Sequence, residues 1–125
     1  MNISRILQEL KMRYPGKNIV QNDSASPTEI ICEIDPTTDH PNYSVAVAII
    51  DKSKLHYHRK LTETYAVLEG ELIVKKDGIS HHLKKGESFV ISPGEVHEAK
   101  GNATWVKVTS RPGWSIEDHY LTSSP

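Results

Sequence analysis

The stretch LHYHRKLTETYAVLEGE, residues 55–71, places two histidines one residue apart and a glutamate five positions later. Side chains along a strand alternate between its two faces, so His56 and His58 point the same way. Glu63 opens the next expected strand and can return a carboxylate beside them. His97, just after the turn SPGEV, is the best placed fourth residue. Imidazole and carboxylate donors suit divalent transition metals, and the pattern therefore predicts a metal site.

The sequence around this stretch has the pattern of short strands separated by turns. Asp77–Gly78 is a strong signal for a two-residue hairpin. We expect strands at 28–34, 43–50, 54–59, 63–70, 71–76, 79–83 and 88–92, at HEAKG (97–101) and at 104–110. About nine short strands with no helical pattern between them predict an all-β sandwich or barrel.

A short helix is expected before the strands, over residues 3–13. Apolar residues recur there at i, i+3, i+4 and i+7, namely Ile3, Ile6, Leu7 and Leu10. Asn2 or Ser4 could cap this helix and Pro15–Gly16 ends it. We expect one domain over residues 1–125, with the barrel at about 28–110 and a C-terminal tail at 111–125.

Composition excludes several classes of partner. The chain has 125 residues and a net charge of −1, and no basic block exceeds two residues, so no nucleic-acid partner is expected. The longest apolar run is the six-residue VAVAII (45–50), and no membrane partner is expected. The single Cys32 and the lack of a signal-like apolar stretch at the N-terminus indicate a cytoplasmic protein.

The spacing of the histidines, glutamate and glycines resembles that of the cupin superfamily. The first cupin motif has Gly, five residues, His-x-His, three or four residues, Glu, six residues and Gly. The second has Gly, five residues, Pro-x-Gly, two residues, His, three residues and Asn. The positions that match are His56, His58, Glu63, Gly70, Gly86, Gly94 and His97. The departures are Ile50 for the leading Gly, Ser92 for the motif Pro and Gly101 for the final Asn.

This resemblance implies a double-stranded β-helix, or jelly-roll barrel, that is usually a homodimer. It also implies one divalent transition metal in the mouth of the barrel, held by His56, His58, Glu63 and His97. Such a set of nitrogen and oxygen donors suits Fe, Mn, Ni, Cu or Zn. Small cupins are often described as mannose-6-phosphate isomerase-like or dioxygenase-like.

Three further groups of residues are candidates for the function. Tyr65 lies two residues beyond Glu63 on the same face, where it would serve as an acid or base beside the cation, or as packing that lines the pocket. Arg59 and Lys60 could bind an anionic substrate, or could belong to a solvated loop. In the tail, Trp114, Asp118 and His119 could fold over the mouth or contact a partner subunit.

Two classes of function fit these residues. One is a metal-dependent enzyme acting on a small oxygenated molecule, of the isomerase or lyase type, or of the dioxygenase type with iron. The other is a non-catalytic, metal-dependent module that binds or senses a small molecule. The fold alone does not decide between them.

Overall fold

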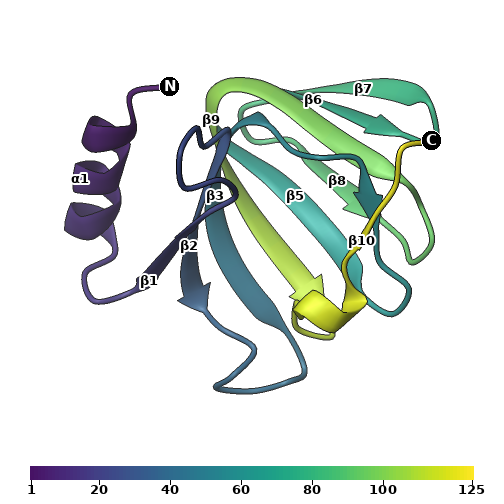
Figure 1. Ribbon diagram of the computed structural model, residues 1–125, viewed down its shortest axis with the longest axis horizontal. Coiled ribbons are helices and arrows are strands. Elements are labelled where there is room, and N and C mark those ends of the chain that lie inside the picture. The colour runs from purple at the N-terminus through teal and green to yellow at the C-terminus, as the bar shows by residue number, and fades with distance from the viewer.

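The computed structural model describes all residues 1–125 and consists of one short N-terminal helix and a curled antiparallel sheet, a half-barrel (Figure 1). The helix is α1 (Ile3–Arg13), and a 3-10 turn, η1 (Ile116–Asp118), lies near the C-terminus. The strands are β1 (Asn18–Gln21), β2 (Glu29–Asp35), β3 (Ser44–Lys52), β4 (His56–Tyr57), β5 (Thr62–Glu69), β6 (Glu71–Lys76), β7 (Ile79–Lys84), β8 (Ser88–Ile91), β9 (His97–Arg111) and β10 (Tyr120–Leu121). No helix has both the length and the apolar content that crossing a bilayer requires.

Strand β9 links the two walls of the half-barrel. Its first half pairs with β6 and β4, and its second half pairs with β3 and β5. Near Gly101 the partner on one edge of β9 changes from β6, where Leu72 pairs with Gly101, to β5, where Glu69 pairs with Trp105. On the other edge, the register with β3 shifts between Ile50 and Lys52. A single 15-residue strand therefore carries His97 at one end of the barrel and reaches β5 at the other. This topology confirms the all-β, cupin-type half-barrel that the sequence predicts.

The inner face of the sheet holds the main apolar core. Its fully buried members come from most strands: Ala48, Ile50, Tyr65, Val67, Leu72, Val74, Leu83, Ile91, Ala99 and Val106. Alternation along β5 places Glu63, Tyr65 and Val67 on this face, because those residues are buried and their neighbours are not. The polar residues Glu63 and Tyr65 are thus supported by the same packing that stabilises the barrel.

Helix α1 covers the outer face of the sheet. Asn2 caps it by accepting a hydrogen bond from the Arg5 N–H at 3.1 Å. Ile6 and Leu10, one turn apart, are buried against an outer core of Ile30, Cys32, Val47, Ile49 and Trp105. The short helix expected over 3–13 is confirmed, and its role is to cover the sheet on the side away from the expected metal site.

The structure corrects the expected strands at three places. Strand β1 was not expected, so the sheet begins at Asn18 and not at about 28. The strand expected at 54–59 is only His56–Tyr57, because the N–H groups of residues 59–61 turn toward Asp118 instead of a neighbouring strand. The segments expected as separate strands at 97–101 and 104–110 form one continuous β9, since the chain bends there without leaving the sheet. The Asp77–Gly78 hairpin is confirmed, with both residues at positive φ.

Two departures from the cupin motifs lie side by side in the structure. A Cβ atom built on Gly101 would stand 2.8 Å from the carbonyl oxygen of Ile50, and would also overlap Thr104. Gly101 therefore leaves room for the neighbouring strand at the bend of β9. Ile50, in place of the leading glycine, is fully buried in the inner core.

Replacing Gly101 by alanine is expected to lower the free energy of unfolding by about 1–3 kcal/mol, because the backbone of β3 must move to accept the methyl group. The measurement is the urea midpoint at neutral pH. Asn102→Ala is the control, since Asn102 is exposed and such a change stays within about 0.5 kcal/mol. Equal midpoints for the two variants would contradict the close contact.

Candidate metal centre

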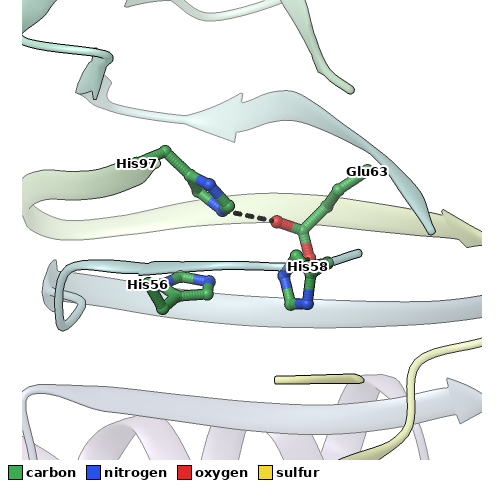
Figure 2. Close-up of side chains that lie close together, drawn as sticks. All are labelled: His56, His58, Glu63 and His97. Atoms are coloured by element: carbon green, nitrogen blue, oxygen red, sulfur yellow. Dashed lines mark hydrogen bonds and ion pairs between the residues drawn. The ribbon is translucent and has the colours of Figure 1, made fainter. Parts of the chain in front are cut away.

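Four side chains from three strands and one loop meet at one end of the half-barrel (Figure 2). His56 on β4 and His97 on β9 are direct partners across the two strands. His58 follows two residues after His56, and Glu63 comes from β5. One donor atom from each residue lies within 4.8 Å of the others, and the four residues are at most 7% exposed. The structure thus brings together all four predicted ligands in a cluster that could hold a metal ion.

Each imidazole ring is oriented by a main-chain carbonyl group. The Nδ1–H of His56 donates to the Lys54 carbonyl oxygen at 2.6 Å. The Nδ1–H of His58 donates to the Asp118 carbonyl oxygen at 2.7 Å, and that of His97 to the Glu95 carbonyl oxygen at 2.9 Å. A carbonyl oxygen only accepts, so each ring must carry its proton on Nδ1. In all three rings Nε2 is consequently the nitrogen available to bind a metal ion. Histidine ligands in metalloproteins are typically oriented in this way, by a hydrogen bond from the other ring nitrogen.

The Nε2 atoms of His97 and His58 converge on the Glu63 carboxylate. His97 Nε2 lies 3.2 Å from Oε1, shown by the dashed line in Figure 2, and His58 Nε2 lies 3.8 Å from Oε2. The His97 contact requires a proton between two groups that are otherwise acceptors, and the buried His58 Nε2 has no hydrogen-bond partner. A divalent cation would replace that proton and satisfy the unpartnered nitrogen. The donor set therefore fits a transition metal ion.

Burial and mutual charge set the protonation of this cluster in the metal-free chain. Burial, and then the positive charge of His97, lower the pKa of His56 to about 3. For Glu63, burial alone would raise the pKa, but the hydrogen bond and charge of His97 outweigh it and hold the pKa at about 2. A neutral His56 and an ionised Glu63 are the forms that bind a cation.

Tyr65 and one residue that the sequence analysis missed, Glu29, complete the polar part of the inner face. The Tyr65 ring is 5% exposed and meets the His97 ring at 6.2 Å between centroids. Burial and the negative charges of Glu63 and Glu29 raise the pKa of Tyr65 well above its usual value, so the metal-free chain keeps a neutral phenol. Burial, and then the charge of Glu63, raise the pKa of Glu29 to about 7.

Strand alternation could have identified Glu29. On β2, Ile30 and Cys32 face the helix, while Ile31 packs against the inner core. Residues 29 and 31 share a face, so Glu29 is a carboxylate on an apolar inner surface. Glu29 was missed because it lies outside the spaced histidines and glutamate from which the site was predicted.

The remaining candidates lie around the cluster. The Arg59 guanidinium is exposed and stacks over the Tyr120 ring at 4.4 Å, and Lys60 is also exposed. Their role in substrate binding stays a prediction. In the tail, His119 stacks on His56 with 4.6 Å between ring centroids, and Trp114 meets His119 at 5.9 Å. The tail thus folds over the cluster, one of the two arrangements expected for it.

Comparisons with known proteins agree with this geometry. A family model described as "Cupin domain" matches residues 45–109, which include all four residues of the cluster. No curated protein matches the chain. Among solved structures, the Streptomyces nucleoside dehydratase Pac13 is 10% identical, with a TM-score of 0.76 over 87% of each chain.

Two other solved structures share the fold. A protein from Planctomyces limnophilus is 24% identical, with a TM-score of 0.70 over 86% of this chain and 92% of that one. Ectoine synthase from P. lautus is 16% identical, with a TM-score of 0.62 over 84% and 82% of the two chains. At these identities the likeness concerns the fold alone, whereas the family match spans more than half of the chain. By the fold and the family match together, this chain belongs to the cupin family.

Proposed function

We propose that this cupin binds one divalent transition metal ion through His56, His58, Glu63 and His97, and that it is an isomerase or lyase for a small oxygenated molecule. The observation that carries the proposal is a buried cluster in which one donor atom from each of the four residues lies within 4.8 Å of the others, while each ring is held through its Nδ1–H. A bound metal ion would supply a Lewis acid that polarises a carbonyl or hydroxyl oxygen.

The residues beside the cluster support proton transfer. Tyr65 remains a neutral phenol in the metal-free chain, and it can donate a proton or a hydrogen bond to an oxygen of the substrate. The pKa of Glu29, about 7, is close to the value that suits a general base at neutral pH. Isomerisation and elimination of water each need one proton removed and one delivered. The fold shared with a nucleoside dehydratase, which is a lyase, agrees with this chemistry.

The first test is elemental analysis of protein purified without added metal. We expect close to one first-row transition metal ion per chain, and the analysis also identifies the metal. Natively folded protein with no metal, which also fails to bind added Co²⁺ or Mn²⁺, would exclude the proposal. Metal binding without turnover of any compound, combined with a ligand that shifts the melting temperature, would favour the binding or sensing module instead. The predicted homodimer stays a prediction.

Replacing Tyr65 by phenylalanine is expected to lower turnover about 10²–10⁴-fold while the metal content stays unchanged, because the ring is kept and only the proton donor is lost. Turnover is measured on keto sugars, small diketones and nucleosides. Tyr57→Phe is the matched control, since Tyr57 stacks on Tyr120 at 5.2 Å, on the other face of its strand from His56. Full activity of the Tyr65 variant would assign the residue to packing alone.

A further inference from the structure

Residues 115–122, called the strap below, run along the strand that carries His56. Strand β10 within the strap pairs with β4, so that Tyr120 lies opposite Tyr57 and Leu121 opposite His56. The Thr122 N–H donates to the Leu55 carbonyl oxygen at 3.2 Å. In Figure 1 the strap is the yellow segment that passes from η1 beside β4 to the C-terminus. Residues 120–122 are held to β4 and its neighbouring residue Leu55, although the two-residue strand β10 is too short to be stable alone.

Asp118 is the buried centre of the strap. It is 7% exposed, although Ile116, two residues earlier, is 65% exposed. Its carboxylate accepts hydrogen bonds from three consecutive main-chain N–H groups: Arg59 at 2.8 Å, Lys60 at 3.1 Å and Leu61 at 3.1 Å. Burial alone would raise the pKa of Asp118, but these N–H groups hold it below its usual range. The carboxylate is therefore ionised at neutral pH, the form that accepts three donors best.

The three N–H groups belong to the loop that connects two members of the metal cluster. His58 immediately precedes this loop, and Glu63, the second residue of β5, lies two residues after it. The main-chain carbonyl of Asp118 also accepts the Nδ1–H of His58. One residue thus orients an imidazole ring through its carbonyl group and holds the following loop through its side chain. Without the Asp118 carboxylate, three N–H groups would lose their acceptor. The main-chain carbonyl at position 118 would remain, but the side-chain contacts that keep it in place beside His58 would be lost.

His119 extends the same contact to the neighbouring ring. It stacks on His56 with an interplanar angle of 23°, and its edge meets the His58 ring at 5.5 Å between centroids. The strap therefore touches both histidines of the His-x-His pair, one through stacking and one through a hydrogen bond. Movement of the strap away from β4 would release both rings at once.

We propose that Asp118 is a positioning residue for the metal site, and that docking of the strap and binding of the metal ion strengthen each other. The proposal rests on the metal site proposed above. A ring and a loop held in place by Asp118 lose less freedom when the metal binds, and a bound metal in turn fixes the ring that Asp118 contacts. Such coupling between two binding events is reciprocal by thermodynamic necessity.

The first measurement is a Co²⁺ titration of the metal-free chain. Asp118→Ala is expected to bind Co²⁺ about 10–100-fold more weakly than the original chain, the usual effect of losing a residue that orients a ligand. Asp118→Asn, which keeps an oxygen acceptor, should recover part of this loss. Glu117→Ala is the matched control, because it removes the same charge one position earlier from an exposed side chain, and its affinity should be unchanged.

The second measurement needs no variant, so it decides the question even if Asp118→Ala does not fold. Amide hydrogen exchange of the original chain is followed with and without Co²⁺. Saturating Co²⁺ should slow exchange of the Arg59, Lys60, Leu61 and Thr122 amides at least tenfold, as these are the amides held by or within the strap. Exchange of Arg5, at the far helix cap, should not change.

The outcomes separate the two proposals. Failure of the original chain to bind Co²⁺ would overturn the proposed metal site. Normal Co²⁺ binding by the original chain, with equal affinity in a folded Asp118→Ala variant, would overturn the positioning role alone. Exchange of the strap amides that does not respond to bound Co²⁺ would overturn the coupling.

Discussion

Replacing His58 by alanine is expected to lower the affinity for a divalent metal more than 100-fold. This exceeds the loss of about 10–100-fold that follows from removing a residue that only orients a ligand. His58 Nε2 is buried without a hydrogen-bond partner, and it faces Glu63 across 3.8 Å. No other side chain of the cluster can take its place, because His56, Glu63 and His97 each already contribute a donor. The measurement is metal content after purification, followed by a Co²⁺ titration of the metal-free variant.

The same variant is expected to lose little stability. His58 lies outside the inner apolar core, and its loss removes one hydrogen bond worth about 1 kcal/mol. Leu72→Ala, in contrast, opens a cavity at a fully buried position and should cost about 2–5 kcal/mol. Both values are measured by urea denaturation in a chelator. His82→Ala is the control for metal content, since this side chain is 54% exposed and contacts Glu71. An unfolded His58→Ala variant would contradict the view that the metal is an addition to an already folded barrel.

The metal-free protein is expected to lose about 3 kcal/mol of unfolding free energy between pH 4.5 and pH 3. The folded-state pKa values of His56 (about 3) and Glu63 (about 2) lie below the ordinary values of 6.5 and 4.5. A group whose pKa is lowered on folding stabilises the folded chain at pH values above its ordinary pKa. That stabilisation is lost as the pH falls toward the folded-state pKa. Below pH 4.5 both groups act together, each at no more than about 1.4 kcal/mol per pH unit, and at about half of that slope where the pH equals one of the group's own pKa values.

Glu29 has the opposite effect at higher pH. Its folded-state pKa of about 7 lies above the ordinary 4.5, so its contribution is full below pH 4.5 and is lost as the pH rises through 7. Between pH 4.5 and 6.5 it opposes His56, and the stability of the original chain should change little there. The Glu29→Gln variant lacks the contribution that offsets His56, so the free energy of unfolding of this variant should already fall as the pH is lowered from 6.5. Both effects are measured by urea denaturation across this pH range in the presence of a chelator. If the free energy of unfolding depended on pH in the same way for the original chain and for Glu29→Gln, the assignment of Glu29 to the inner face would be contradicted.

Features that depend on local spacing were predictable from the sequence. The helix follows from Asn2 and the apolar pair Ile6 and Leu10, and the Asp77–Gly78 hairpin follows from the turn itself. His56 and His58 converge because they lie two residues apart on one strand. In each of these cases the residues that determine the geometry are neighbours in the chain.

Features that depend on distant partners were not predictable in the same way. The loop after His58 is held by a carboxylate 57 to 59 residues later, which no local pattern marks. Two strands were expected at 97–101 and 104–110, whereas the structure has one continuous β9, in which Gly101 leaves room for the Ile50 carbonyl at a bend. Glu29 lies on the inner face because β2 pairs with β3, where Glu29 is opposite Ile50. Its sequence neighbours show that residues 29 and 31 share a face, but they do not show that this face is the inner one.

The position of Asp118 in the chain has a consequence for biosynthesis. It follows His58 by 60 residues, a distance that a ribosome covers in about 3–12 s at 5–20 residues per second. During that interval the nascent chain carries His56, His58 and Glu63 without the Asp118 carbonyl that orients His58 and without the carboxylate that holds the loop between His58 and Glu63. With the proposed coupling, tight loading waits for the emergence of the strap, and early encounters with cellular metal ions are weak and reversible. The choice of metal then falls to the completed fold and not to the first ion that the nascent chain meets.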